Sequence, residues 1–158
     1  MQIRIIDSPV GELRLAAEDG FLTELRFGCP ADNPPDSTVE PVLDEAERQL
    51  AEYFRGERKA FDIPLKPKGT PFQLADWEAL KEIPYGETVT YGDIARRIGR
   101  PKAFRAVGSA NHNNPISIIV PCHRVIGAGG KLTGYGGGLD VKQKLLELEQ
   151  KWKENGEV

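Results

Sequence analysis

The chain has 158 residues and a mass of 17.5 kDa, which allows one ordinary domain or two small ones. Hydrophobic residues make up 39% and charged residues 28%, which is typical of a globular protein and excludes a mostly disordered chain. The longest apolar runs reach about five residues, whereas a bilayer span needs about 20, so we expect a soluble protein with no membrane partner. The start lacks the build of a signal peptide, and we expect a cytoplasmic location, or a nuclear one in a eukaryote.

The net charge of -3 conceals an uneven distribution of charge along the chain. Residues 1–60 carry 7 Lys and Arg against 13 Asp and Glu, whereas residues 81–130 carry 7 against 3. A cationic middle in an acidic protein points to a local site for a polyanion, although a solvated basic helix face gives the same pattern.

The first quarter of the chain is typical of strands. Short, partly alternating apolar segments cover residues 2–6, 12–17 and 22–27. Ser-Pro-Val-Gly and Glu-Asp-Gly turns separate them, which favours an antiparallel meander. Residues 28–39 have the composition of a loop, and the apolar spacing over residues 41–54 predicts a helix.

A proline-rich linker follows over residues 63–71 and predicts a domain boundary. Thr70 and Pro71 then open a helix, because threonine is a good N-cap and proline suits the first turn. We therefore expect an α/β (α+β) protein with two parts. Residues 1–67 form a small antiparallel sheet-and-helix domain, and residues 68–158 form a helical, winged-helix-like domain.

Two short helices joined by a tight turn follow in the second part. Thr90 caps a helix that reaches Ile98, a Gly-Arg-Pro turn follows, and a second helix covers residues 103–111. This order predicts a helix-turn-helix with Arg105 on its recognition helix and Lys102 at its start, although such pairs are also plain packing units. A glycine-rich tract and an amphipathic helix over residues 139–152, with Leu139, Leu145, Leu146 and Leu148 on its apolar side, complete the chain.

Cys29 and Cys122 are the two cysteines, too few for a disulfide framework, and the two histidines are too few for an ordinary zinc site. We therefore predict neither a metal nor a cofactor. Cys29 lies in a loop composition and is expected to be a spare thiol. Cys122 follows a predicted buried strand over residues 116–120 and stands beside His123 and Arg124, which supply a base and a positive charge to activate a thiol. A buried structural cysteine remains the alternative.

The segment Pro-Cys-His-Arg-Val at residues 121–125 resembles the signature of the O6-alkylguanine-DNA alkyltransferase family. The resemblance extends to residues 84–91, 105–108 and 145–149, and covers roughly residues 70–152. It implies DNA repair by direct, irreversible and stoichiometric transfer of an alkyl group from O6-alkylguanine in DNA to a cysteine, with O4-alkylthymine as a second candidate substrate. The N-terminal region agrees with the family only in its size and element order.

The resemblance also implies a role for each matching residue. Cys122 is the nucleophile, His123 accepts its proton through a water, and Glu149 polarises the histidine. Tyr91 is the general acid toward the leaving purine. The residues expected to shape the substrate pocket are Asn114, Val125, Tyr135 and Gly136.

Double-stranded DNA is the partner that the resemblance implies. The recognition helix enters the minor groove, and Arg105 fills the base stack after the target nucleotide flips out. Lys102 and Arg124 are expected to contact DNA as well. We expect the protein to act as a monomer. Two other functions compete: a helix-turn-helix regulator with a structural Cys122, and a lesion sensor that binds without reacting, although such sensors lack the cysteine.

Overall fold

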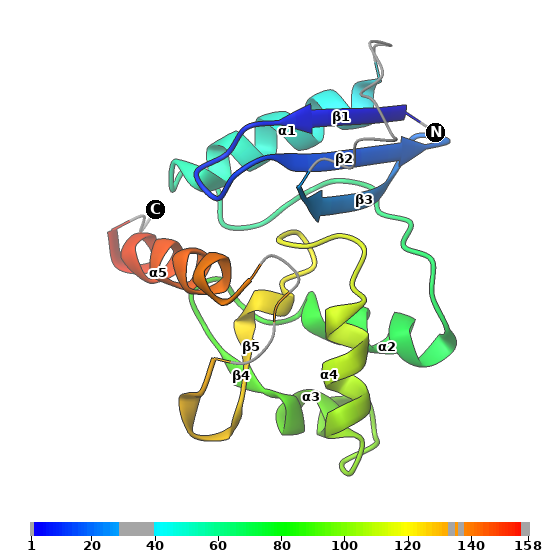
Figure 1. The fold of residues 1–158 in the computed structure, drawn as a ribbon, viewed down its shortest axis with the longest axis vertical. Helices are drawn as coiled ribbons and strands as arrows, with labels where there is room; N and C mark the ends of the chain where they lie inside the picture. Colours follow the sequence, from blue (N-terminus) through cyan, green and yellow to red (C-terminus); the bar gives the residue numbers. More distant parts are fainter. Residues whose placement is uncertain (1, 29–39, 133–134, 136–137, 156–158) are drawn as a thin grey trace. The chain divides into compact units, whose positions relative to one another are not determined.

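The computed structural model describes residues 2–28, 40–132, 135 and 138–155, and Figure 1 shows its ribbon. The chain divides into two compact units, Met1–Lys68 and Gly69–Val158. No helix among the described residues is both long and apolar enough to cross a membrane. The loop predicted over residues 28–39, including Cys29, lies outside the described residues apart from Gly28.

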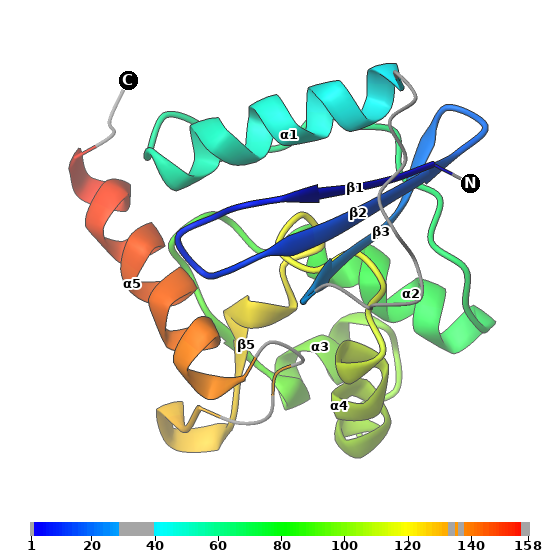
Figure 2. The same ribbon diagram turned by 45° about the horizontal axis from the view of Figure 1, so that its top comes forward.

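The first unit contains the predicted antiparallel meander. Its strands are β1 (Gln2–Ile6), β2 (Leu13–Glu18) and β3 (Phe21–Phe27), with β2 in the centre. The two residues between β2 and β3, Asp19 and Gly20, both have positive φ, 54° and 81°, which is the backbone of a tight hairpin turn. Helix α1 (Pro41–Phe54) lies along one face of this sheet, as Figure 2 shows, so the expectation of a mixed α/β fold is confirmed.

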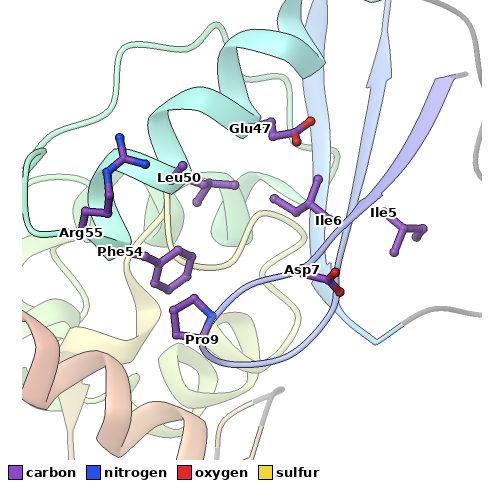
Figure 3. A pocket seen from close by; sticks show the side chains of 9 residues that line it. Ile5, Ile6, Asp7, Pro9, Glu47, Leu50, Phe54 and Arg55 are labelled. Atoms are coloured by element: carbon purple, nitrogen blue, oxygen red, sulfur yellow. The ribbon is translucent and has the colours of Figure 1, made fainter.

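Helix α1 is amphipathic, and its buried side chains face β2 and β3. A hollow of about 620 Å³ opens where the end of α1 meets the end of β1 and the turn after it (Figure 3). Its lining combines apolar side chains with Asp7, Glu47 and Arg55, and it includes no cysteine, serine or histidine. None of the site residues predicted from the sequence lines this hollow, and all of them fall within the second unit.

The first half of the predicted linker belongs to the first unit. The Leu22 N–H donates to the Pro64 carbonyl (2.9 Å), and the Lys66 N–H donates to the Leu22 carbonyl (3.0 Å), so the chain pairs with the edge of β3. Gly69 begins the second unit, and a Cβ there would come within 2.6 Å of the Trp77 ring. A residue without a side chain is needed at this position.

Four helices form most of the second unit: α2 (Pro71–Leu80), α3 (Tyr91–Arg97), α4 (Phe104–His112) and α5 (Leu139–Asn155). Thr70 and Thr90 cap α2 and α3 in complete capping boxes, which is why both helices start where the sequence predicts. Helices α2, α3 and α4 pack on one another. Gly99, at φ 78°, makes the turn between α3 and α4, and the predicted helix-turn-helix arrangement is present.

The segment predicted as a buried strand, residues 116–120, is buried but is not a strand. It forms tight turns, with Val120 N–H donating to the Ile116 carbonyl (3.1 Å), and Ile118 adopts a φ of 72° that a β-branched side chain rarely takes. The sheet pairing lies just beyond, where β5 (Val125–Ile126) runs parallel to β4 (Val89–Thr90). An apolar run alone does not distinguish a strand from a buried turn.

The buried face of α5 also differs from the prediction. Leu139 is exposed, and the buried side chains are Val141, Lys142, Leu145 and Glu149. Lys142 and Glu149 are two turns apart on one face of the helix, so α5 turns two charged groups into the interior. Such groups need partners in the second unit.

A third buried charge-bearing group lies where α2 packs against α4. Asp76 is fully buried, and burial raises its pKa to about 7. The amide of Asn111 on α4, with its nitrogen turned toward the carboxyl, donates to both Asp76 oxygens (2.5 and 3.1 Å) and acts against this shift. The pair joins the two helices through a titratable contact.

Asp76→Asn is expected to weaken the pH dependence of stability. The folded carboxyl keeps its proton up to about pH 7, whereas the unfolded one releases it near 3.8, so the free energy of unfolding falls as the pH rises between these values. The variant should therefore gain stability relative to the wild type from pH 4.5 to pH 7.5, in urea unfolding followed by tryptophan fluorescence. Trp77 and Trp152 are the only tryptophans of the sequence, so the signal comes from the second unit. Glu78→Gln on the same helix is the control. The expectation would be contradicted if the stability of Asp76→Asn and that of the wild type changed equally with pH.

Candidate active site

The residue before the buried turn holds that turn in shape. The side-chain amide of Asn114 donates to the Val120 carbonyl (2.8 Å), and its oxygen accepts from the Ile116 N–H (3.0 Å). The same amide nitrogen lies 3.3 Å from the Cys122 Sγ. Asn114 therefore holds the two ends of the turn together and also presents a hydrogen-bond donor to the thiol.

Cys122 begins a single 3-10 turn, Cys122–Arg124, that follows Pro121. Its side chain is buried, and burial raises the pKa of the thiol to about 11, although the hydrogen bond from Asn114 acts in the opposite direction. The thiol is therefore protonated at neutral pH in this state. It becomes a nucleophile only if a neighbouring base removes its proton.

His123, the next residue, is such a base. Its Nε2 lies 2.6 Å from Oε2 of Glu149, and both side chains are buried. Burial lowers the pKa of His123, and the Glu149 carboxylate opposes this without reversing it, so the ring is neutral. Because Nε2–H donates to the carboxylate, Nδ1 is the acceptor, and it is buried without a hydrogen-bond partner among the described residues. A buried acceptor of this kind can receive a proton.

Glu149 is ionised although it is buried. Burial alone would raise its pKa, but His123 and Arg124 outweigh this and hold the pKa well below its usual range. Arg124 donates to both carboxylate oxygens, from Nε to Oε1 (2.8 Å) and from Nη2 to Oε2 (3.0 Å). The Gly86 N–H adds a further hydrogen bond to Oε1 (3.1 Å). Each oxygen thus accepts two hydrogen bonds.

The position of Arg124 corrects its predicted role as a DNA contact. Its side chain is 8% exposed, and the guanidinium is paired with Glu149, donates from Nη1 to the Ile83 carbonyl (2.7 Å) and lies over the Tyr85 ring. A phosphate cannot replace these partners without leaving Glu149 as an uncompensated buried charge. Charge and sequence position suggested DNA binding, but burial assigns Arg124 to the support of His123 and Glu149.

Lys142 is a functional candidate that the sequence reasoning missed. It is buried on α5 and donates from Nζ to the carbonyl of Val125 (2.6 Å), one of the predicted pocket residues. Burial lowers the pKa of Lys142, and the electrostatic influence of Cys122 acts in the opposite direction. Lys142 is seven residues from Glu149, which places both on the same face of the helix. This spacing is the sequence signal that indicates a buried Lys142.

The predicted pocket residue Tyr135 and the predicted general acid Tyr91 lie in different segments of the second unit. Tyr135 is buried, burial raises its pKa, and Ser117 and Cys122 both act on its phenol group. Tyr91 starts α3, and its ring lies against Gly108 of α4, where an added Cβ would be 3.8 Å from the ring. Gly136 lies outside the described residues.

The remaining predicted residues lie on the surface. Arg105, on the first turn of α4, and Lys102, in the turn before it, are both exposed. The described residues contain no group of three or more His, Cys, Asp or Glu that could hold a metal ion.

Arg124→Gln should destabilise the second unit by about 3–5 kcal/mol, because it removes one partner of a buried ion pair and leaves Glu149 charged. Urea unfolding followed by tryptophan fluorescence measures this loss. Lys102→Gln, the matched change at an exposed cation, should stay within about 0.5 kcal/mol of the wild type. Equal stability of the two variants would show that the Arg124–Glu149 contact does not support the fold.

Two sequence models from one protein family match the chain in order. The ribonuclease-like domain of 6-O-methylguanine DNA methyltransferase matches residues 1–67, and the DNA binding domain of the same protein matches residues 71–151. A methylated-DNA--protein-cysteine methyltransferase of Methanosarcina acetivorans is 58% identical over 153 residues, covering 94% of this chain and 98% of that protein. A protein of the same name from Mycobacterium tuberculosis is 55% identical over 150 residues, with 93% and 91% covered.

Solved structures agree with these matches. The structure of Mycobacterium tuberculosis OGT in complex with DNA superposes with a TM-score of 0.88 at 52% identity, covering 96% of this chain and 94% of that one. An O6-methylguanine DNA methyltransferase from Methanococcus jannaschii has a TM-score of 0.68 at 31% identity, with 93% of each chain covered. With both domains matched in order and relatives that align over nearly its whole length, the chain belongs to the 6-O-methylguanine DNA methyltransferase family.

Proposed function

We propose that this protein repairs O6-alkylguanine in DNA by moving the alkyl group onto its own Cys122 in one irreversible step. Transfer to a protein cysteine from methylated DNA is the activity in the names of its relatives. The observation that carries the proposal is the buried contact between His123 and Glu149 directly after Cys122 in the chain. The thiol is buried, the next residue is a neutral histidine, and the ring of that histidine is hydrogen-bonded to an ionised Glu149. These residues support a nucleophile–base–orienter arrangement in which a water links Cys122 to His123.

The bonds and protons balance in a single displacement. The thiol proton passes through a water to Nδ1 of His123, and the sulfur attacks the alkyl carbon attached to O6. A carbon–sulfur bond forms as the carbon–oxygen bond breaks, and the electron pair of the broken bond stays on guanine. Tyr91 neutralises the leaving purine by donating a proton to a ring nitrogen. The product is a thioether, which water does not cleave readily, so each molecule reacts once.

The pocket residues hold the base in this scheme. Asn114 keeps the turn closed and donates toward the sulfur. Lys142 fixes the Val125 carbonyl, which leaves that group oriented at the edge of the site. We assign a pocket wall to Tyr135 and a backbone N–H toward the guanine oxygen to Gly136. All of these groups belong to one chain, and the proposed transfer uses them alone.

The chain offers a cationic surface to the DNA. Residues 94–139 contain no Asp or Glu and carry seven Lys and Arg, of which Arg124 is buried, whereas Arg105 and Lys102 are exposed. Such a surface binds phosphates with little sequence preference. We propose that α4 enters the minor groove and that Arg105 occupies the place of the extruded guanine, because chemistry on a base inside a duplex requires flipping.

The first test is the mass of the intact protein after incubation with an oligonucleotide carrying O6-methylguanine. The wild type should gain the mass of one methylene, mapped to the peptide with Cys122, and the gain should stop at one. Cys122→Ser should show no gain while still binding the lesion DNA, because binding uses the helix and pocket rather than the sulfur. Cys29→Ser is the matched control and should react fully. Transfer by a Cys122→Ala variant would refute the proposal.

Two further substitutions separate flipping from chemistry. Arg105→Ala should slow repair of duplex DNA by about ten-fold or more, since the unstacking cost of a few kcal/mol is then less compensated, and should leave the reaction with free O6-benzylguanine unchanged. Tyr91→Phe should slow both substrates by about 100-fold, because the leaving base loses its proton donor in either case.

Single-turnover rates at two salt concentrations measure both effects. If Arg105 only contacts phosphate, its loss weakens binding of all DNA alike and lowers the salt slope by about one unit. Equal slowing of Arg105→Ala on the duplex and on the free base would show that the arginine does not take part in extrusion.

A further inference from the structure

The first residue of α4 is a large apolar side chain in an exposed position. Phe104 is 50% exposed, more than Phe21, Leu74 or Leu139, the other large hydrophobic side chains exposed among the described residues. The side chains of α4 that face the interior are Val107, Ala110 and Asn111. By helical spacing Phe104 begins the side of α4 that Val107 and Asn111 continue, but at the start of the helix it remains 50% exposed to solvent.

The surroundings of Phe104 are cationic. Arg105 follows it, with the guanidinium carbon 5.9 Å from the centre of the phenyl ring. The turn before it forms a hollow lined by residues 100–103, among them Arg100 and Lys102. No acidic residue occurs between residues 94 and 139, and Asp93 just before this stretch is paired with Arg96, so positive charge predominates in this part of the sequence.

An exposed aromatic ring among cations fits one class of partner better than others. A nucleic acid has phosphates on the outside and flat, apolar base faces within the stack. Proteins that bind the minor groove insert apolar side chains between base steps and thereby unstack them. A peptide partner with acidic side chains would match the cations but would leave the ring without a flat surface to stack on.

We propose that Phe104 is a wedge that enters the base stack beside Arg105 and helps to extrude the damaged nucleotide. The inference rests on the proposed function and adds a residue to its DNA contact. Arg105 fills the vacated position, and the ring of Phe104 stacks on the adjacent base that extrusion leaves uncovered. The contact between ring and guanidinium holds the two side chains together as one inserting unit.

The experiment compares Phe104→Ala, Phe104→Trp and the wild type on duplex DNA carrying O6-methylguanine and on free O6-benzylguanine. Loss of one base–aromatic stack corresponds to about a five-fold to 150-fold effect. Phe104→Ala should therefore react at least about five-fold more slowly with the duplex and equally fast with the free base. Phe104→Trp, which keeps a flat ring, should stay close to the wild type on both. Leu74→Ala, an exposed apolar side chain on α2, is the matched control and should change neither rate.

A second measurement needs no chemistry. 2-Aminopurine placed next to the lesion becomes fluorescent when it unstacks, and this increase on binding should be smaller with Phe104→Ala than with the wild type at saturating protein. Unchanged duplex rates and fluorescence in Phe104→Ala would overturn the inference, and so would equal slowing on the free base. If the proposed function itself failed, the wild type would leave Cys122 unmodified, while the fluorescence of the wild type and Phe104→Ala would still test the wedge.

Discussion

One buried carboxylate holds the active part of the second unit together. Glu149 accepts two hydrogen bonds on each oxygen, from Arg124 and Gly86 on Oε1 and from His123 and Arg124 on Oε2. Burial of an isolated carboxylate costs several kcal/mol, so the charge is tolerated only while these donors surround it. The position of α5, the ring orientation of His123 and the turn at Gly86 therefore depend on one another.

The same burial leaves the thiol unreactive at rest. Cys122 is 6% exposed, and its pKa of about 11 means that it carries its proton at neutral pH. A thiol in this state resists oxidation and stray electrophiles, both of which react with the thiolate. Burial and protonation therefore protect the Cys122 thiol from side reactions.

Local signals in the sequence predicted much of the fold. Helix α1 begins and ends where the apolar spacing indicates, and the Thr70 and Thr90 caps mark the starts of α2 and α3. The strand expected over residues 116–120 was wrong because the left-handed conformation of Ile118 has no signature in its residue type. A β-branched side chain keeps that conformation only where tertiary contacts impose it.

The candidate site was less predictable for the same reason. Cys122 and His123 stood out from their neighbours in the sequence, but Glu149 came from a resemblance, and its contact with His123 depends on a turn that no local pattern specifies. Arg124 was misassigned because a buried cation and a surface cation are alike in sequence. Lys142 and Asp76 were overlooked because polar residues on an apolar helix face look solvated until the packing of a second element is known.

The separation of His123 and Glu149 along the chain has a consequence for protein synthesis. The two residues are 26 positions apart, and α5 supplies the carboxylate after every other element of the site has been made. Chains grow from the N-terminus and fold as they emerge, so the cysteine and histidine leave the ribosome before the group that orients them. Until α5 docks, the histidine lacks its orienting partner. The order of translation thus assembles the reactive centre last.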